Sequence, residues 1–241
     1  MPKIITIIQA RMSSTRLPGK ILLPLGEITV LGLGVSRIKK SQRLDAVIVA
    51  TTDLTSDDVT ANYCLDNGIH YFRGNCDNVL ERYYMAAKQY GAKVGDLIVR
   101  MTSDCPFIDY RILDAMLENF QGDYFSNTLT RSFPRGFDLE IFTFAALEKA
   151  YLSAENPSEK EHVTPYIYNH PEMFSLHGFG CDEDNSDLRV TLDTPEDWQV
   201  IEQTYLSLSK TNPDFTYQDV IKFLRQNPQV AKLNALVEQK K

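Results

Sequence analysis

The chain has 241 residues, of which 43% are hydrophobic and 24% are charged, and its formal net charge is −7. These proportions are typical of a soluble globular protein with a substantial core, in one large domain or two small ones. The acidic balance argues against a broad nucleic-acid-binding surface. No apolar run approaches the roughly 18–20 residues that a membrane span needs, and no secretory leader is recognisable, so we expect a cytoplasmic protein.

The four cysteines are far apart in the sequence. They are Cys64, Cys76, Cys105 and Cys181, and no C-x-x-C motif is present. This spacing favours neither a zinc site nor a disulfide framework. We therefore expect reduced thiols, most of them buried as small apolar side chains.

Short apolar, β-branched runs alternate with helical patterns through the first half of the chain. The runs that predict strands are 3–9, 45–52, 68–72 and 96–103. The patterns that predict helices are 30–39, 56–67 and 77–90. Alternating strands and helices indicate an α/β fold, with a mostly parallel sheet that is covered by helices.

The second half has a mixed pattern. We expect strands at 123–127 and 139–144, and antiparallel pairing of 174–179 and 187–193. The expected helices are 145–153, 159–169, 195–208 and 217–225. These elements predict a single domain over residues 1–225. The polar stretch 226–241 is expected to be a tail that is loose or bound to a partner.

A basic segment, QARMSSTRLPGK (9–20), directly follows the first predicted strand. It contains Arg11, Arg16 and Lys20 and no acidic residue. Ligands of open α/β sheets bind beyond the carboxyl ends of the strands, so this loop is well placed for an anionic ligand. Ser13 and Ser14 would let the backbone approach phosphate oxygens, and arginine can grip them with two donors. A solvated surface loop is the alternative, because neither G-x-G-x-x-G nor the P-loop motif is present.

The same segment resembles the N-terminal signature R-x-x-S-x-R-x-P-x-K of the sugar-activating cytidylyltransferases. It is most similar to the branch of spore-coat polysaccharide biosynthesis protein F, related to the acylneuraminate and 3-deoxy-manno-octulosonate enzymes. The resemblance implies a Rossmann-like nucleotide-diphospho-sugar transferase fold, with helices on both faces of a mixed sheet. It also implies that the loop, with Gln9 and Ala10, wraps the triphosphate of CTP. The branch usually has glycine where this chain has Ser13.

Two carboxylates, Asp104 and Asp193, each follow a predicted strand and precede a proline-containing turn. Two such groups can bind one Mg²⁺ together with phosphate oxygens and water. Taken alone, Asp193 could equally cap a helix and Asp104 could equally be a turn residue. V-R-M-T-S-D-C-P and V-T-L-D-T-P-E-D resemble the acid-bearing segments of the family, which implies that Asp104 and Asp193 are Mg²⁺ ligands.

Two further segments resemble parts of the family that border the nucleotide, namely A-T-T-D (50–53) and R-G-N-C-D-N-V-L-E-R (73–82). With the strand end before Asp104, they imply a second group of nucleotide contacts. These are Thr51, Asp53, Arg73, Asp77, Arg82 and Thr102. Considered without the resemblance, Asp77 could equally be a helix cap.

The sugar side is implied by three other matches to the branch: Asn127, P-R-G-F-D-L-E (134–140) and E-H-V-T-P-Y (161–166). The resemblance implies sugar contacts from Asn127, Glu140, Glu161 and His162. On its own, a histidine such as His162 is more often a packed or surface residue.

The implied reaction is attack of a sugar hydroxyl on the α-phosphorus of CTP, which releases pyrophosphate and forms a CMP-activated, nonulosonate-like acidic sugar. Arg11, Arg16 and Lys20 would serve catalysis by neutralising phosphate charge. One alternative is a glycosyltransferase that uses the acidic motif 182–184, and another is a non-catalytic nucleotide-binding homologue. We expect no membrane or nucleic-acid partner. A homodimer is one candidate assembly, and the sequence leaves the oligomeric state open.

Overall fold

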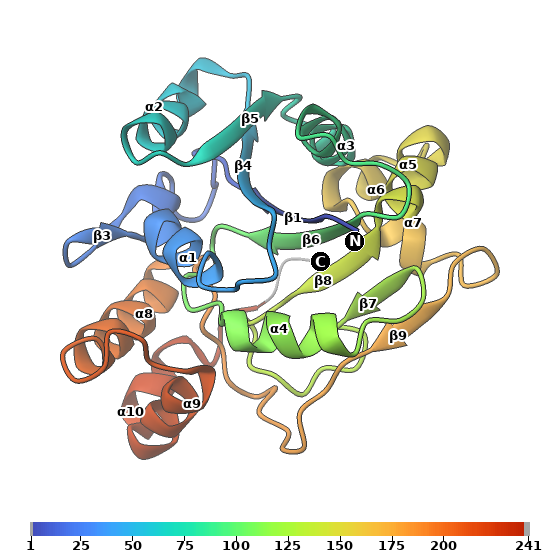
Figure 1. Cartoon of the computed structure of the whole chain (residues 1–241). Helices are drawn as coiled ribbons and strands as arrows, with labels where there is room; N and C mark the ends of the chain where they lie inside the picture. The colour runs from blue at the N-terminus through green and yellow to red at the C-terminus, as the bar shows by residue number, and fades with distance from the viewer. Residues whose placement is uncertain (1, 239–241) are drawn as a thin grey trace.

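The computed structural model describes residues 2–238 of the chain. Seven strands form its central sheet: β1 (Ile4–Gln9), β4 (Ala46–Thr52), β5 (His70–Gly74), β6 (Leu97–Thr102), β7 (Tyr124–Ser126), β8 (Glu140–Thr143) and β9 (Leu176–Gly178). Their order is β5-β4-β1-β6-β8-β7-β9, as Figure 1 shows. Strands β5, β4, β1 and β6 are parallel, whereas β8 is antiparallel to both β6 and β7. The four strands predicted in the first half are therefore confirmed.

Helices flank both faces of this sheet. They are α1 (Val30–Ile38), α2 (Asp58–Asp66), α3 (Val79–Gln89), α4 (Tyr110–Glu118), α5 (Phe144–Ser153), α6 (Pro157–His162), α7 (Pro165–Tyr168), α8 (Pro195–Leu208), α9 (Tyr217–Gln226) and α10 (Pro228–Ala231). A small hairpin of β2 (Pro24–Leu25) and β3 (Ile28–Thr29) precedes α1.

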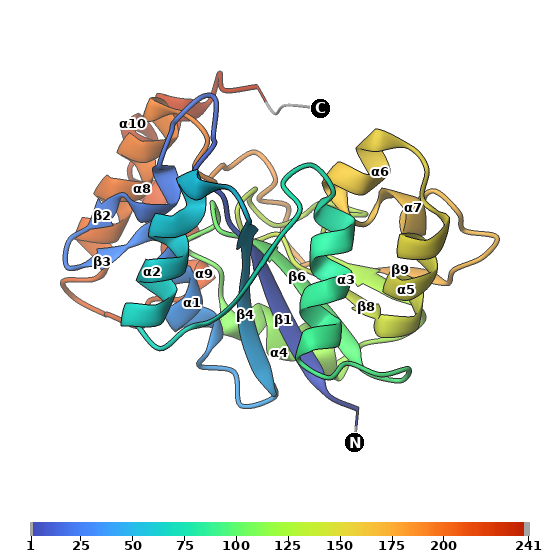
Figure 2. The same ribbon diagram turned by 90° about the horizontal axis from the view of Figure 1, so that it is seen from above.

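The core has two layers, one on each face of the sheet. Apolar residues of α1, α2, α4, α8 and α9 pack in the first layer, and those of α3, α5 and α7 pack in the second. Figure 2 shows the two groups of helices on either side of the strands. Alternate residues of β1 separate accordingly, since Ile8 belongs to the first layer and Ile7 to the second. The expected α/β fold with helices on both faces is confirmed.

The part of the chain after β6 corrects three of our expectations. Helix α4 was not predicted, although Ile112, Leu113 and Met116 bury one face of it. The helix expected at 159–169 is divided into α6 and α7, because Val163 adopts a positive φ of 71° between them.

The third correction concerns the expected antiparallel pair. Strand β9 instead pairs in parallel with β7, and 187–193 contributes a single parallel bridge from Arg189 to Arg135. The side chain of Arg189 is bonded to Asp193 and Asp197, so this stretch is held by ion pairs where we expected a strand ladder.

The described part of the expected tail is not loose. After α9, helix α10 and the short 3-10 helix η3 (Lys232–Asn234) pack against α8 and α9. Val230 and Asn234 are 5% and 2% exposed. Residues 239–241 of the expected tail lie outside the described residues. The rest of the segment contributes to the fold.

Two smaller expectations concern cysteines and membranes. All four cysteines are free, with Cys64 and Cys105 buried and the other two half-buried, as expected for reduced thiols. Among the described helices, none has the length and apolar character required to cross a bilayer.

Candidate functional site

A cavity of about 590 Å³ opens at the carboxyl ends of β1 and β6. It lies between the loop after β1, the start of α3, the segment joining β7 to β8, and α6. Fourteen of the predicted site residues line it together. They are Gln9, Ala10, Arg11, Ser13, Ser14, Arg16, Lys20, Arg82, Thr102, Asp104, Glu140, Glu161, His162 and Asp193.

The loop after β1 is held in place by its backbone. The amide of Met12 donates a hydrogen bond to the buried carboxylate of Asp57 at 2.8 Å. The amide of Gly19 donates one to the carbonyl of Met12 at 3.1 Å. Gly19 has a φ of 72°, which favours glycine, and it leads directly into the turn that carries Lys20. The loop therefore presents its cations in a defined shape. Ser13 is exposed at the cavity.

Lys20 lies between the two predicted metal ligands. Its Nζ is 3.0 Å from Oδ2 of Asp104, 2.8 Å from Oδ1 of Asp193 and 2.6 Å from the carbonyl oxygen of Leu192. Burial acts to lower the pKa of Lys20, but the charges of Asp104 and Asp193 outweigh it and raise that pKa above its ordinary value. The ammonium group thus remains charged where the two carboxylates converge.

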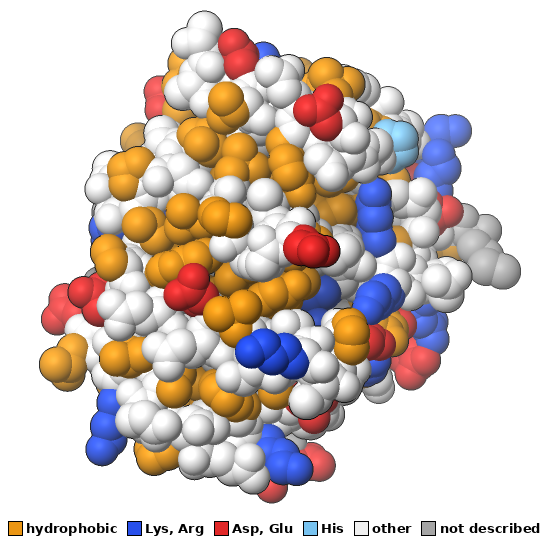
Figure 3. All heavy atoms as spheres, turned by 90° about the vertical axis from the view of Figure 1, so that its left-hand side faces the viewer, with side chains coloured by type: hydrophobic (Ala, Val, Ile, Leu, Met, Phe, Trp, Pro, Cys, Tyr) orange, Lys and Arg blue, Asp and Glu red, His pale blue; other side chains and the backbone are white. Residues whose placement is uncertain are grey.

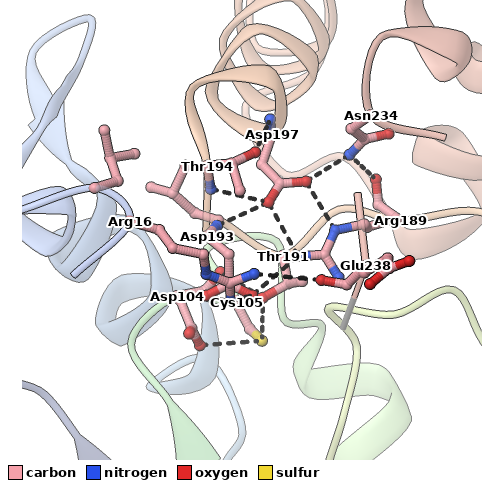
Figure 4. A network of polar contacts seen from close by, with 12 residues as sticks. Arg16, Asp104, Cys105, Arg189, Thr191, Asp193, Thr194, Asp197, Asn234 and Glu238 are labelled. Carbon is pink, nitrogen blue, oxygen red and sulfur yellow. Dashed lines mark hydrogen bonds and ion pairs between the residues drawn. The ribbon is translucent and has the colours of Figure 1, made fainter. Parts of the chain in front are cut away.

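Asp193 belongs to a wider network that Figure 4 shows. Its Oδ2 accepts from Arg16 at 3.0 Å and from Arg189 at 2.9 Å, and Arg189 also pairs with Asp197. Burial acts to raise the pKa of Asp193, but Lys20 and Arg16 outweigh it and hold that pKa below its usual value. The carboxylate is therefore ionised at neutral pH.

Of the two local roles that competed with metal binding, the turn position of Asp104 is observed and the capping role of Asp193 is not. Helix α8 is capped by Thr194 and Asp197 in a reciprocal capping box, so Asp193 is not its cap. The carboxylate of Asp104 accepts from no backbone amide among the described residues; it accepts from Lys20 and, at 3.7 Å, from the thiol of Cys105. Both carboxylates are directed instead toward a common point.

That common point has the character of a cation site. One oxygen from each carboxylate lies within 3.0 Å of the same ammonium nitrogen, and carboxylate oxygens are the ligands that Mg²⁺ prefers. No cluster of three or more His, Cys, Asp or Glu side chains suited to a metal occurs within residues 2–238. A divalent cation here would take its remaining ligands from substrate oxygens and water.

The predicted sugar contact Glu140 lines the cavity, but its oxygens already have partners. Glu140 is 7% exposed, accepts an ion pair from Arg100 and accepts a hydrogen bond from the hydroxyl of Tyr124 at 2.6 Å. Arg100 also donates to Gln9 at 3.2 Å. Glu161 and His162 are exposed at the end of α6 and have no such partners in the described structure.

Arg82 is the most enclosed cation of the cavity, at 1% exposed. It donates to the backbone carbonyls of Asn75 and Cys76, and its Nε has no partner. Burial lowers the pKa of Arg82 from its ordinary value. A buried guanidinium without a carboxylate partner indicates an anionic ligand nearby.

Five predicted residues lie outside the cavity lining: Thr51, Asp53, Arg73, Asp77 and Asn127. Arg73 pairs with Asp58 at 2.7 Å and also donates to the carbonyls of Thr52 and Leu54.

The other four residues likewise do not line the cavity. Thr51 is fully buried, and Asp53 is exposed. Asp77 is exposed, and the cap of α3 is Asn78. The amide of Asn127 bonds the backbone of Phe137 and Leu139, which fixes the segment between β7 and β8. The structure thus gives Arg73 and Asn127 structural partners.

Several cavity residues were missed by sequence reasoning, namely Arg100, Arg131, Arg135, Asp138 and Tyr168. Two of them, Arg135 and Asp138, lie within the P-R-G-F-D-L-E segment that we had placed on the sugar side. The charged residues of that segment were the sequence signal that could have identified Arg135 and Asp138 as site residues.

The acidic motif of the glycosyltransferase alternative lies elsewhere. Asp182 and Glu183 line a second cavity beside α4 and α9, and Asp184 is exposed on the same loop. The acidic motif, which was the reason to consider a glycosyltransferase, therefore lies outside the cavity that the basic loop lines.

Comparisons with known proteins identify the family of the chain. Residues 5–241 match the family model described as cytidylyltransferase. The chain is 34% identical to the spore coat polysaccharide biosynthesis protein SpsF of Bacillus subtilis, over 96% of this chain and 98% of that protein. It is 39% identical to an uncharacterised protein of Methanocaldococcus jannaschii, over 99% and 97% of the two chains.

Solved structures add two further similarities. A cytidylyltransferase from Leptospira borgpetersenii superposes with a TM-score of 0.89 at 38% identity, over 100% of both chains. A CMP-2-keto-3-deoxy-manno-octonic acid synthetase in complex with CTP gives 0.60 at 16% identity, over 86% of this chain and 99% of that one, which shows a shared fold. With the family model, these matches show that the chain belongs to the cytidylyltransferase family and is a nucleotidyltransferase.

Proposed function

We propose that the protein transfers CMP from CTP to a free acidic, nonulosonate-like sugar and releases pyrophosphate, in the biosynthesis of a surface polysaccharide or glycan. The observation that carries the proposal is one cavity in which the basic loop after β1 faces Asp104 and Asp193. Membership of the cytidylyltransferase family supports CTP as the nucleotide. The name of the relative SpsF, a spore coat polysaccharide biosynthesis protein, supports the pathway class.

The residues of the chain would act mainly through charge and position. Arg11 extends from the loop without an internal partner among the described residues, so it is free to bind phosphate. Arg16 and Lys20 are held at the carboxylates and would neutralise the triphosphate and the departing pyrophosphate. Reaction would follow when the sugar hydroxyl is aligned with the α-phosphorus.

We further propose Mg²⁺ as the metal, held by Asp104 and Asp193. The convergence of these carboxylates on one ammonium group supports that assignment, since a divalent cation needs the same oxygens. When bound, the ion would stabilise negative charge on the phosphate oxygens. Lys20 would then shift its bonds from the carboxylates to phosphate.

The central test is pyrophosphate release. The protein is incubated with each of the four ribonucleoside triphosphates, Mg²⁺ and a panel of acidic and neutral sugars. Release only with CTP plus an acidic sugar would support the proposal. Nucleoside diphosphate formed from a nucleotide sugar would favour a glycosyltransferase, and binding without turnover on the whole panel would favour a non-catalytic homologue.

A narrower prediction concerns Asp104. Asp104→Ala removes one oxygen ligand of the proposed metal and leaves the charge of Lys20 less balanced. We expect turnover to fall by at least about a hundredfold, the scale seen when charge stabilisation of a transition state is lost. Circular dichroism and the melting temperature check that the fold is retained. A rate close to that of the unaltered protein would remove Asp104 from the mechanism.

We also propose a homodimer. Figure 3 shows apolar side chains gathered on the side of the molecule where α2, α8 and the β2–β3 hairpin lie. Exposed apolar residues of these helices include Val59, Leu65 and Leu206. Exposed apolar patches often mark protein interfaces. Analytical ultracentrifugation should give about twice the chain mass of 27.4 kDa, and a monomer at micromolar concentration would contradict the proposal.

A further inference from the structure

The segment that joins β7 to β8, residues 127–139, contributes a second group of charged side chains to the cavity. Arg131, Arg135 and Asp138 all line it. They come from a different segment than the basic loop, because they precede β8, on the far side of β6 from β4, whereas the basic loop follows β1 and is bonded to Asp57 beside β4. The cavity therefore has two separate groups of cations.

Within this second group, Arg131 and Asp138 neutralise each other. The two guanidinium nitrogens of Arg131 lie 2.6 and 3.0 Å from the two carboxylate oxygens of Asp138, a forked pair. This pairing leaves Arg135 without an acidic partner. Within residues 2–238, the guanidinium of Arg135 has neither a hydrogen bond nor an ion pair.

The other cations of the cavity differ in this respect. Arg16, Lys20 and Arg100 are paired with carboxylates. Arg82 is bonded to backbone carbonyls. Arg11 and Arg135 are then the two cavity cations that lack any partner in the described structure. Since they come from different segments of the chain, each is available to a separate anionic group of the ligands.

Arg135 is also held rigidly, unlike an ordinary surface arginine. Its amide donates to the carbonyl of Leu188 at 3.0 Å, and its carbonyl accepts from the amide of Val190 at 2.7 Å. The next residue, Gly136, has a φ of 115°, and a Cβ there would lie 2.6 Å from the backbone of Val190. The flanking Phe133 and Phe137 are 2% and 0% exposed. A fixed backbone therefore presents this guanidinium to the cavity.

The charge surroundings of Arg135 agree with an anion site. Burial lowers the pKa of Arg135 from its ordinary value, and the neighbouring charge of Arg131 lowers it further. A partly buried cation beside another cation is unfavourable without a counter-charge. A bound anion would supply that charge.

Resting on the proposed function, we propose that Arg135 binds the carboxylate of the acidic sugar and thereby selects an acidic over a neutral acceptor. A guanidinium matches a carboxylate with two parallel hydrogen bonds, which gives both strength and orientation. Arg11 and its neighbours in the basic loop would bind the triphosphate. The sugar carboxylate would thus place the acceptor hydroxyl between the two groups of cations.

The test compares an acidic sugar that the unaltered protein accepts with the carboxamide of the same sugar. For the unaltered protein we expect kcat/KM to be about tenfold to a hundredfold higher for the acid, the usual range for a charged hydrogen bond. In Arg135→Gln this preference should fall to near unity through the KM for sugar, while the KM for CTP changes less than about twofold. Arg135→Lys should restore part of the preference, because it keeps the charge without the fork.

Two matched variants serve as controls. Arg43→Gln removes a surface arginine that pairs with Glu118 outside the cavity lining, and it should leave both KM values unchanged. Arg11→Gln removes the other unpaired cavity arginine and should raise the KM for CTP instead. Circular dichroism verifies the fold of each variant.

Equilibrium binding separates failure of this inference from failure of the proposed function. Calorimetry measures CTP and the acidic sugar separately with each protein. If the unaltered protein neither turns over nor binds any acidic sugar, the proposed function and this inference are both overturned. If it does, and Arg135→Gln keeps the preference for the acid or loses CTP affinity instead, only the role of Arg135 is overturned.

Discussion

At the scale of single residues, the site depends on how burial and charge act on each ionisable group. Lys20 is 8% exposed, and its charge is retained because two carboxylates lie within 3.0 Å. The negative charge of Asp193 is in turn stabilised by ion pairs with Lys20, Arg16 and Arg189. Breaking such a buried pair from one side leaves an uncompensated charge, which usually costs several kcal/mol. These residues are therefore coupled, and single substitutions will not add independently.

Cys64 shows the effect of burial without such compensation. Its thiol projects from α2 into the core, and burial raises its pKa from 9.0 to about 12. Because this pKa is higher in the folded state, the protonated thiol favours the folded protein. The stabilisation is present below pH 9 and is lost as the pH rises toward 12. We expect the free energy of unfolding to fall over that window, and to fall less steeply in Cys64→Ala. Urea denaturation at several alkaline pH values measures both slopes.

Thiol labelling gives an independent check on the same residue. At pH 8 in the folded protein, iodoacetamide should modify the half-buried Cys76 and Cys181 well before Cys64, because the thiolate is the reactive form. Mass spectrometry of the digested protein identifies the labelled positions. Equal labelling of Cys64 in the folded state would show that its thiol is accessible and ionised.

At the scale of elements, the C-terminal helices are tied to the site. The amide of Asn234 donates to the carbonyl of Arg189 at 3.1 Å and to Asp197 at 2.8 Å. Asp197 holds the side chain of Arg189, which pairs with Asp193. The carbonyl of Glu238 also accepts from Arg16 at 3.3 Å. The C-terminal segment is far from the basic loop in sequence, yet it helps to position Asp193, the carboxylate with which that loop pairs.

Asn234→Ala tests this support. It removes two hydrogen bonds from partly buried or buried groups, so we expect a loss of about 1–3 kcal/mol in the free energy of unfolding. Turnover should also fall, since Arg189 loses one of the contacts that position it. Gln229→Ala on the exposed side of α10 is the matched control. An unchanged denaturation midpoint for Asn234→Ala would show that these two hydrogen bonds contribute no net stability.

At the scale of the whole molecule, Arg37 joins parts of the chain that are far apart. It lies on α1, is 3% exposed, and donates to the carbonyls of Ile108 at 2.8 Å and Phe215 at 2.9 Å. Its guanidinium also lies over the ring of Phe215, 4.4 Å from the centroid. These contacts connect α1, the turn before α4 and the turn before α9.

Arg37→Met keeps much of the side-chain volume and leaves both carbonyls without their donor. We expect a loss of about 1–3 kcal/mol for each unsatisfied buried group, so the midpoint of urea denaturation should fall clearly. Arg43→Met at an exposed surface pair should have almost no effect. A midpoint equal to that of the unaltered protein would mean that the buried charge cost as much as its bonds contributed.

The sequence by itself determined the parallel half of the sheet, the position of the basic loop after β1, and the position of Asp104 shortly after the end of β6. These features depend on local apolar periodicity and on the rule that loops at the carboxyl ends of parallel strands share one edge. Glycine and proline at the turns gave the boundaries. The break at Val163 and the parallel pairing of β9 have no comparable local signal, because they depend on contacts between distant segments.

Only the tertiary structure decided how the charges are distributed in the site. It showed Lys20 between Asp104 and Asp193, Glu140 bonded to Arg100, and Asn127 and Arg73 in structural contacts. It also brought Arg135 to the cavity without a partner. Whether a charged side chain serves the fold or a ligand depends on which opposite charge lies within about 3–4 Å, and for Lys20 residues more than 80 positions away supply that charge.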